Sequence, residues 1–568
     1  MQQTPISDYS ETTAFGSWRG KARARVKRAS QAVSILGRFG FTWVLHELEI
    51  LPRPRKSKMN AAVARLEMPE RLRQALQELG PTAIKLGQVL ASRADLISES
   101  YVRELRELQD NVIHSPVEEV RQVIREELGA EVEELFAEFE AHPRAAASIA
   151  QVHFARLHDG TPVGVKVQRL HVAEMMETDL DVILWAARQA ERSVTWAAEN
   201  HVHALAQEFA GTLRQELDFL IEAHNTQRLK ENLADDENVY VPEVHWDLST
   251  HRVLVVEWVE GAKVSDPEQL AAFEVDAPAA AQVFSATMLH QIMRDGYFHG
   301  DPHAGNVLFL GGAKIAFLDC GNCVAVDRMV RENLLSMLMA ALNDDAQEVA
   351  EYLLMLGAVG DRTDVTQLTA DIGRMLSFYS GFQTSAQIGL GQLLDRLLQM
   401  VLRHGVRMQP SLAAIAKSLV VVEGIALELD PKFDSQSLVR QEVRQLMLER
   451  LAPSYLLGEF MRIIRSTNRY ARLLPRQINQ VLARMQGGGI GIRMVHENLE
   501  QPLHRLDLMI NRIAFALVVS AVIVSSTNLV TSSPGVSPIG RWMMGIYMVI
   551  GLVLGGWLLF SILRSGRL

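Results

Sequence analysis

The stretch "FHGDPHAGNVLF", residues 298–309, decides the fold class of this chain. Asp301 and Asn306 stand five positions apart in it, and "IAFLDCGN", residues 315–322, places Asp319 eighteen positions after Asp301. Phosphoryl-transfer sites need one aspartate that faces the attacking oxygen, then an asparagine and a second aspartate that hold magnesium. Each match is common by itself, but the order of the three along the chain favours one shared site.

A different metal site is the competing interpretation, because His299 and His303 flank the first aspartate. Zinc sites need three or four protein ligands, and no further His or Cys set completes a sphere here. Cys320 and Cys323 form C-x-x-C, which in redox or zinc sites accompanies a helix N-terminus or a second pair. Neither is evident, so we expect both cysteines to be small residues after the metal aspartate.

A strand lysine lies upstream of these motifs. Residues 143–168 alternate between apolar and polar positions around one turn, and the second strand, "VGVKV", carries Lys166. Such a lysine neutralises phosphates and is itself held by a helix glutamate. The helix that follows offers Glu216 and Glu222, which lie on different faces, so only one of them can be the simple partner of Lys166. A solvated acidic face is the alternative.

The residues ahead of this strand occupy the place of a phosphate-binding loop. They are Ala145, Ala146, Ala147 and Ser148, where kinases use glycine because backbone N–H groups must close on phosphate. Two interpretations are open: a nucleotide loop with a restricted backbone, or a buried alanine turn. The strand lysine and the later aspartates favour the nucleotide loop.

Helical spacing predicts helices that begin near Pro69 and Pro81 and a long helix over residues 173–233. A strand pair is expected over residues 239–261 and a short hairpin around Gly311 and Gly312. This order of elements predicts an α+β, bilobal, protein-kinase-like fold.

The chain has 568 residues, which is too long for one core, and its formal net charge of -10 argues against a nucleic-acid partner. Its two cysteines give no disulfide framework. The expected parts are a basic segment (1–60), a helical extension (61–143), an N-lobe (144–275), a helical C-lobe (276–490), and a linker with two transmembrane helices (491–568).

The C-terminal part carries two uncharged apolar runs, residues 513–530 and 542–563. Each is about long enough to cross a hydrocarbon core of ~30 Å, and the short turn between them predicts a two-helix transmembrane hairpin. Arginines outside both runs place the large domain in the cytoplasm, although Arg541 in the turn weakens this bias. We therefore expect an inner-membrane protein, with a buried soluble hairpin as the alternative.

The N-terminal segment is strongly basic between residues 18 and 28 and is followed by a bulky apolar run. Two interpretations are equally open for it. The segment lies on an anionic membrane surface, or it forms a solvated basic helix that packs on its own protein.

Three motifs together resemble those of the UbiB (AarF) family, atypical kinase-like proteins of ubiquinone biosynthesis. "PTAIKLGQVLASRADL", residues 81–96, looks like the Lys-x-Gly-Gln signature of that family, with Lys85, Gly87 and Gln88. "AAASIAQVH" looks like its alanine-rich loop, and "ELDF", "GDPHAGN" and "LDCG" look like the rest of its kinase core. The similarity is close from about residue 80 to residue 327.

The resemblance implies that the chain binds ATP or ADP with Mg²⁺ and acts as an ATPase. It also implies roles for single residues. Glu222 would pair with the strand lysine, Glu216 would contact the helical extension, and the backbone of Glu257 and Val259 would meet the adenine. The Lys85–Gln88 helix would fold over the active site and block a protein substrate. Without the resemblance, that helix carries only a polar stripe that faces solvent equally well.

One position departs from the family pattern, because Cys320 stands where most members carry Phe after the metal aspartate. Three functions stay open. The first is a membrane-anchored ATPase in ubiquinone or related isoprenoid-lipid metabolism, with a lipid or quinone precursor and other quinone-biosynthesis proteins as partners. The second is a true protein or small-molecule kinase. The third, a nucleotide-sensing membrane scaffold, is disfavoured by the complete set of chemical residues.

Overall fold

The computed structural model describes most of the chain up to residue 450. The described ranges are 18–47, 63–91, 97–108, 114–358, 363–381 and 389–450, with four single positions at 542, 546, 549 and 553. The chain divides into two compact units, Met1–Leu456 and Leu457–Leu568, and the first contains all of the described ranges except those four positions. The two expected membrane spans lie outside the described residues apart from the same four positions. Within the described part, no helix is long and apolar enough to cross a membrane.

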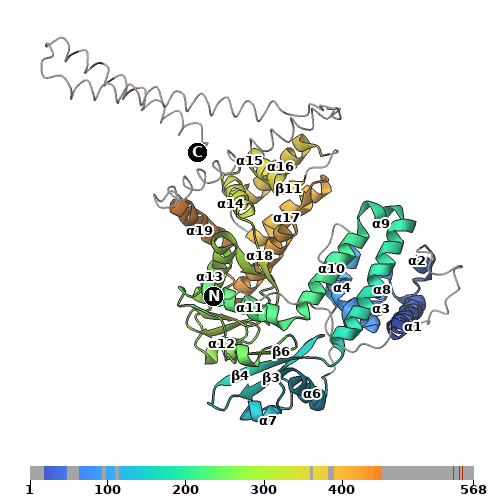
Figure 1. Ribbon diagram of the computed structural model, residues 1–568. Helices are drawn as coiled ribbons and strands as arrows, with labels where there is room; N and C mark the ends of the chain where they lie inside the picture. The colour runs from blue at the N-terminus through green and yellow to red at the C-terminus, as the bar shows by residue number, and fades with distance from the viewer. Residues whose placement is uncertain are drawn as a thin grey trace, which may run out of the picture. The chain divides into compact units, whose positions relative to one another are not determined.

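The N-lobe is built on an antiparallel sheet in the order β1-β3-β4-β6, with β2 also paired to β3. The strands are β1 (Glu138–Phe139), β2 (Ala145–Ala146), β3 (Ala150–Arg156), β4 (Pro162–Gln168) and β6 (Val253–Glu257). Val163, Val165 and Val167 of β4 are fully buried on one face, in a cluster with α6 (Val117–Leu128) and α7 (Val132–Leu135). Figure 1 shows both helices beside this sheet. The helix α6 belongs to the stretch assigned to the extension, yet it completes the core of the N-lobe.

Strand alternation sends Lys166 to the opposite face of the sheet from these valines. Lys166 is centrally placed, opposite Val152 of β3 and Leu254 of β6. On that face lies α11 (Phe219–Asn232), whose Phe219 and Ala223 share a small buried cluster with Leu254.

The long helix expected over residues 173–233 is four helices. They are α8 (Val172–Ser193), α9 (Thr195–Glu199), α10 (Val202–Glu216) and α11. The last break falls at Leu217 and Asp218, where Asp218 leaves the helical conformation and its carboxylate accepts the N–H of Leu220. The Gln168 side chain donates to the carbonyl of Leu217 at 2.8 Å, which fixes the break against β4.

The helical extension comprises α1 (Trp18–Arg38), α2 (Thr42–Glu47), a short 3₁₀ turn (Val63–Arg65), α3 (Met68–Leu79), α4 (Pro81–Ala91) and α5 (Glu99–Arg106). The expected helix starts at Pro69 and Pro81 are confirmed. Gly80, at φ +100°, turns the chain between α3 and α4. Arg28 of α1 pairs with Asp179 of α8, which joins the extension to the N-lobe helices.

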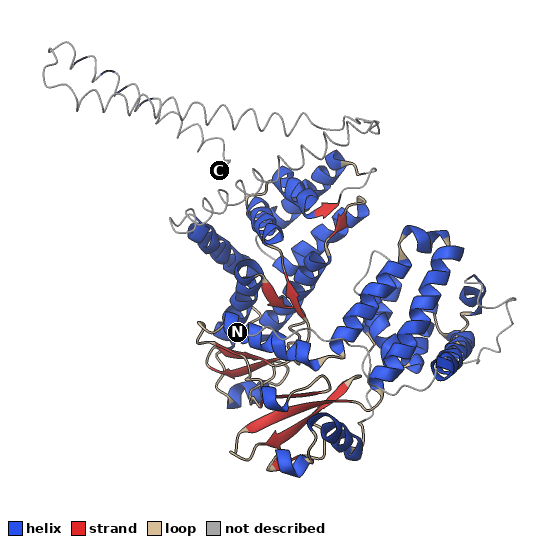
Figure 2. Ribbon diagram, in the orientation of Figure 1, coloured by secondary structure: helices blue, strands red, loops and turns tan. Residues whose placement is uncertain are grey.

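The C-lobe is mainly helical (Figure 2). Its helices are α12 (Pro267–Ala272), α13 (Ala277–His290), a π-helical turn (Gln291–Asp295), α14 (Arg328–Leu342), α15 (Ala346–Leu356), α16 (Val365–Gly381), α17 (Leu390–Arg403), α18 (Pro410–Leu429) and α19 (Ser435–Arg450). Its strands are β5 (Val239–Tyr240), β7 (Tyr297–His299), β8 (Val307–Gly311), β9 (Lys314–Phe317), β10 (Cys323–Ala325), β11 (Gly357–Ala358) and β12 (Arg407–Met408).

Two short strand pairs in this lobe flank the loop from Gly300 to Asn306, which we call the catalytic loop after its predicted role, and the Asp319 motif. The expected hairpin around Gly311 and Gly312 is confirmed as β8 and β9, and β7 pairs with β10. The strand pair expected over residues 239–261 is confirmed in part, because Val244 forms an antiparallel bridge with Val256 of β6. The start of the first half, β5, instead runs parallel to β9, and β6 also joins β4. The 3₁₀ turn Trp246–Leu248 lies between the two halves.

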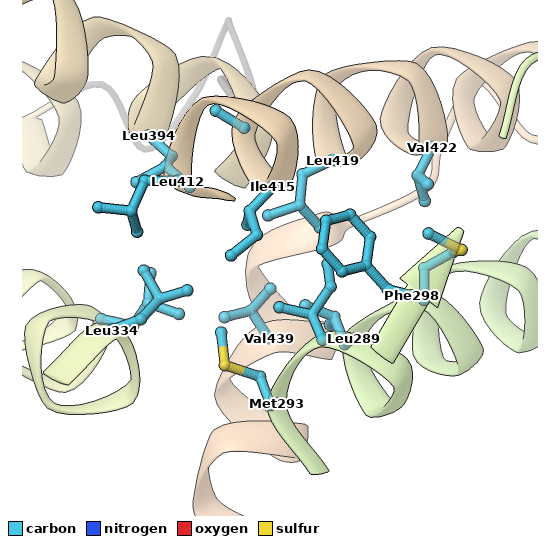
Figure 3. Close-up of a cluster of buried hydrophobic side chains, with 14 of the residues drawn as sticks. Leu289, Met293, Phe298, Leu334, Leu394, Leu412, Ile415, Leu419, Val422 and Val439 are labelled. Carbon is cyan, nitrogen blue, oxygen red and sulfur yellow. The ribbon is translucent and has the colours of Figure 1, made fainter. Parts of the chain in front are cut away.

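The helix α18 forms the centre of the C-lobe core (Figure 3). Its buried residues Leu412, Ile415, Leu419 and Val422 recur at helical spacing and pack in one cluster with Phe298 of β7. The strand that leads into the catalytic loop is therefore packed directly on α18.

The contact of α17 with α18 depends on Gly391. A Cβ at this position would lie 2.4 Å from the backbone nitrogen of Val420, so Gly391→Ala forces the two helices apart. We expect a loss of roughly 1–3 kcal/mol in the free energy of unfolding, the usual cost of overpacking, measured by denaturant titration.

The matched control is Gly424→Ala on α18, where a Cβ would have no atom within 4 Å. Because alanine is the better helix former, this variant should be neutral or more stable by about 0.5–1 kcal/mol. Equal stability of the two variants would contradict the close α17–α18 contact.

Candidate functional site

The site is organised around the ammonium of Lys166. Its Nζ lies 2.8 Å and 2.7 Å from the two carboxylate oxygens of Glu222 and 3.0 Å from Oδ2 of Asp319. These three residues come from β4, α11 and the loop after β9, so the cluster ties the N-lobe sheet to the C-lobe. The structure thus brings together the predicted strand lysine, one of its two candidate partners and the predicted metal aspartate.

Local structure fixes both carboxylates. Glu222 lies in the first turn of α11, directly after the Asp218 cap, and is buried. Asp319 follows β9, and its Oδ1 accepts the N–H of Gly321 at 2.9 Å. A Cβ on Gly321 would lie 3.0 Å from that oxygen, so the Asp-x-Gly spacing lets the chain turn tightly behind the carboxylate.

The charges in this cluster shift its protonation equilibria. Burial alone would lower the pKa of Lys166, but the negative charges of Asp319 and Glu222 outweigh it and raise that pKa above the ordinary value. Burial would likewise raise the pKa of Asp319, yet the Lys166 charge and the Gly321 N–H hold it well below its usual range. Both groups therefore stay charged at physiological pH.

Glu222 behaves differently, because it is buried and lies beside a second carboxylate. Burial raises the pKa of Glu222 from 4.5 to about 7, and the charge of Asp319 adds to this, against the opposing charge of Lys166. As the pH falls, Glu222 therefore takes up a proton before Asp319 does.

The catalytic-loop residues lie beside this cluster. Asp301 follows β7, and its backbone N–H donates to Nδ1 of His299 at 3.1 Å. The Asn306 side chain donates to the carbonyl of Asp301 at 3.2 Å, and the Asn306 carbonyl accepts the N–H of Leu318 at 2.9 Å. These bonds place Asn306 next to the residue that precedes Asp319.

The donor set fits magnesium better than zinc. With its amide nitrogen engaged, Asn306 retains its side-chain oxygen, and Asp319 contributes an ionised carboxylate. Mg²⁺ is held by one or two carboxylates together with waters and substrate phosphates, so such a sparse set suffices. Among the described residues no group of three or more His, Cys, Asp or Glu side chains could hold a metal ion.

The extension reaches the neighbourhood of the site through Lys85. Its Nζ lies 2.9 Å from Oε2 of Glu216, at the end of α10, so Glu216 is engaged with the extension and Glu222 with the strand lysine. Oδ1 of Asp218 is hydrogen-bonded to Nδ1 of His251 at 2.7 Å, and the same carboxylate caps α11. Gln88 donates to the backbone oxygen of Leu108 at 3.3 Å, which holds its amide at the end of α5 and not in the Lys166 cluster.

The alanine-rich loop is a tight turn between β2 and β3. The Ala147 N–H donates to the carbonyl of Ala150 at 2.8 Å, and the Ala147 carbonyl accepts from the Arg169 side chain at 3.0 Å. Ala145 and Ala146 are paired to β3. Ser148 is buried, and its hydroxyl has no hydrogen-bond partner among the described residues. In this arrangement the Ala147 amide is already used within the loop.

The predicted adenine contacts lie at the end of β6. The backbone N–H of Glu257 donates to the carbonyl of Glu243 at 2.9 Å, and the Glu257 carboxylate accepts from the Tyr240 hydroxyl at 2.6 Å. The backbone N–H of Trp258 donates to the carbonyl of Pro162 at 3.0 Å. Val259 follows Trp258, where the chain leaves the sheet.

Cys320 takes a packing position directly after Asp319. It is fully buried in the C-lobe core, and its carbonyl accepts from the Asn225 side chain at 3.0 Å. The Tyr297 hydroxyl donates to the side-chain oxygen of the same Asn225 at 2.7 Å. The helix α11 is therefore tied both to β7 and to the loop that contains Cys320. The interpretation of this cysteine as a small packing residue agrees with its burial.

One residue of the site was missed by the sequence reasoning. Lys417 of α18 places its Nζ 2.9 Å from Oδ1 of Asp301. No local motif marks it, because it reaches the catalytic loop only through the packing of α18.

The raised pKa of Glu222 predicts the pH dependence of stability. Between its unfolded pKa of 4.5 and its folded pKa of about 7, the folded state holds a proton that the unfolded chain has lost. The free energy of unfolding of the wild type, relative to Glu222→Gln, should therefore fall by about 2 kcal/mol as pH rises from 5 to 7.5.

Denaturant titrations at several pH values measure this difference, with Glu231→Gln, an exposed position on the same helix, as the control. A difference that instead grows with pH would show that Lys166 dominates and depresses the pKa of Glu222.

Comparison with known proteins identifies the family to which the chain is similar. Residues 107–353 match the ABC1 atypical kinase-like domain, residues 379–434 the UbiB helical domain, and residues 497–564 the ABC1/UbiB kinase-like C-terminal domain. A Pseudomonas aeruginosa protein named "Probable protein kinase UbiB" is 35% identical over 394 residues, covering 69% of this chain and 74% of that protein.

Two further similarities extend the comparison. An uncharacterized Clostridium pasteurianum protein, encoded in the 5' region of hydrogenase 1, is 28% identical over 96% of this chain and 100% of its own length. A Mycobacterium tuberculosis protein solved with erythromycin is 24% identical, with a TM-score of 0.42, over 62% of this chain and 90% of that one. Together with the family domains, the 35% identical relative confirms the α+β protein-kinase-like fold, and the chain belongs to the ABC1/UbiB family of atypical kinase-like proteins.

Proposed function

We propose that this protein is a magnesium-dependent ATPase built on the kinase-like fold. The observation that carries the proposal is the Lys166–Glu222 ion pair with Asp319 on the same ammonium. The lysine–glutamate pair and the metal aspartate must both be in place for phosphoryl transfer, and here they are in direct contact.

Each residue of the site has a separate part in this chemistry. Lys166 binds the phosphates of ATP and is oriented for this by Glu222. Asp319 and Asn306 would hold Mg²⁺, which would supply positive charge that neutralises the phosphates. Asp301 accepts a hydrogen bond from the attacking hydroxyl group or water and orients its oxygen toward the phosphorus atom.

Hydrolysis is preferred over transfer because of the extension. The Lys85–Glu216 ion pair anchors α4 at the junction of α10 and α11, two residues before the cap of the helix that carries Glu222. A helix held there supports the proposal that a protein substrate is kept from the site while water enters. Transfer to a lipid or protein is the second candidate, favoured by the carboxylate of Asp301, which is about one-third exposed at 35%.

For the physiological role, we propose support of ubiquinone or related isoprenoid-lipid biosynthesis at the inner membrane. The membership in the UbiB family supports the quinone connection. The two apolar runs at 513–530 and 542–563 support a membrane anchor, and their flanking arginines support a catalytic unit on the cytoplasmic side. A membrane lipid or an isoprenoid quinone precursor, and other quinone-biosynthesis proteins, are the partners this role implies.

ATP turnover by the full-length protein in lipid vesicles tests the enzymatic proposal. We expect Mg²⁺-dependent release of phosphate that falls at least roughly 100-fold in Lys166→Ala and in Asp319→Asn, because each removes charge stabilisation of the phosphates. Lys314→Ala, an exposed strand lysine on β9, should retain wild-type turnover. Absence of magnesium-dependent turnover in the wild type would remove the ATPase proposal, and label transferred to an added acceptor would favour a kinase.

The quinone role is tested in cells. A strain without the gene should lose quinone, and the wild-type gene should restore it while an Asp319→Asn copy should not. Unchanged quinone content in the deletion strain would contradict the physiological proposal, whatever the turnover result.

A further inference from the structure

We propose that Lys417 is a second cationic residue of the phosphoryl-transfer site, supplied by the helical domain and directed at the phosphoryl group being transferred. The inference deepens the proposed function and rests on it. It assigns to α18 a part in the chemistry of the site, beyond its part in the core.

The first argument is position. The Lys417 ammonium lies 2.9 Å from the carboxylate of Asp301, the residue proposed to face the attacking oxygen. The attacking oxygen and the transferred phosphorus atom are neighbours in the reaction, so a cation at Asp301 is within a side chain's reach of the terminal phosphate. The Lys417 side chain is 51% exposed, which leaves its flexible stem free to reorient when nucleotide enters.

The second argument is the rigidity of the base from which this side chain extends. The neighbouring Ser418 is fully buried, and its hydroxyl donates to the carbonyl of Gly300 at 3.1 Å. On the buried face of α18, Ile415 and Leu419 lie close to Phe298 (Figure 3). The catalytic loop is therefore held to α18 both by a hydrogen bond next to Asp301 and by core packing before it.

The third argument is charge. Phosphoryl transfer needs cations around the equatorial oxygens of the transferred group, and a lysine or arginine often supplies part of that charge. The catalytic loop from Gly300 to Asn306 contains neither residue type. Lys166 is engaged by Glu222 and Asp319. Lys417 is the ammonium that the fold places at Asp301.

The stability of the fold does not explain the pair. An ion pair between side chains that are 51% and 35% exposed contributes little to folding, because water screens it and two long side chains lose freedom. Ser418 and the apolar face of α18 already fix the helix against the loop.

Binding measurements separate this role from a merely structural one. The probes are MgADP and MgADP with aluminium fluoride, which occupies the place of the transferred phosphoryl group. Lys417→Met should lose roughly 100-fold in affinity for the aluminium fluoride complex, while its affinity for MgADP stays within about twofold of wild type. Lys417→Arg should recover most of the loss, since it restores the charge. Lys432→Met, which removes an exposed lysine shortly after α18, is the matched control.

Two outcomes overturn the inference. Wild-type affinity of Lys417→Met for both probes would show that the ammonium does not face the phosphoryl group. An equal loss for both probes would assign Lys417 to the fold or to general nucleotide binding. Failure of the wild type to hydrolyse ATP would refute the ATPase proposal alone, because the comparison of the two probes is read from binding and still decides the role of Lys417.

Discussion

The structure depends on one ammonium, that of Lys166, held between the carboxylates of Glu222 and Asp319. Three separate elements must deliver these groups to one point: the central strand β4, the capped helix α11 and the turn after β9. Burying such a cluster costs free energy unless every charge is compensated. The arrangement is therefore weak evidence for a role in stability and stronger evidence for a functional site. The raised pKa of Glu222 reflects its burial first and the neighbouring charge of Asp319 second.

In the C-lobe, the helix α18 likewise holds residues of the site in position. The helix packs its apolar face under β7, donates a hydrogen bond from Ser418 to the catalytic loop, and presents Lys417 to Asp301. A helix of the core thereby sets the position of the loop that carries Asp301. The extension contacts the end of α10 through the Lys85–Glu216 ion pair, two residues before the cap of α11.

Much of the site could be predicted from sequence because its residues fall in ordered local motifs. Lys166, Asp301, Asn306 and Asp319 each sit in a recognisable strand or loop, and the structure gathers them. The choice between Glu216 and Glu222 could not be made from spacing, since spacing assumes one continuous helix and Asp218 ends it. An aspartate followed by an apolar helical run is a cap signal that would have shown the break.

Tertiary packing decides what the sequence leaves open. The strand β5 joins β9 and not β6, because the partner of a two-residue strand is chosen by the core around it. Lys417 reaches Asp301 only because α18 packs under β7. The direction of the Lys85–Gln88 helix was likewise undecidable, since its polar stripe suits solvent and protein equally well; the structure pairs Lys85 with Glu216 and leaves Gln88 on the backbone of Leu108.

The most direct measurement of the central claim is the affinity for ADP with and without Mg²⁺, in the wild type and in Asp319→Asn. If Asp319 holds Mg²⁺ beside the phosphates, Mg²⁺ should raise wild-type affinity roughly tenfold or more, about 1.4 kcal/mol, and this gain should vanish in the variant. A magnesium gain of equal size in both proteins would show that Lys166, Glu222 and Asp319 are a structural ion cluster and not a nucleotide site.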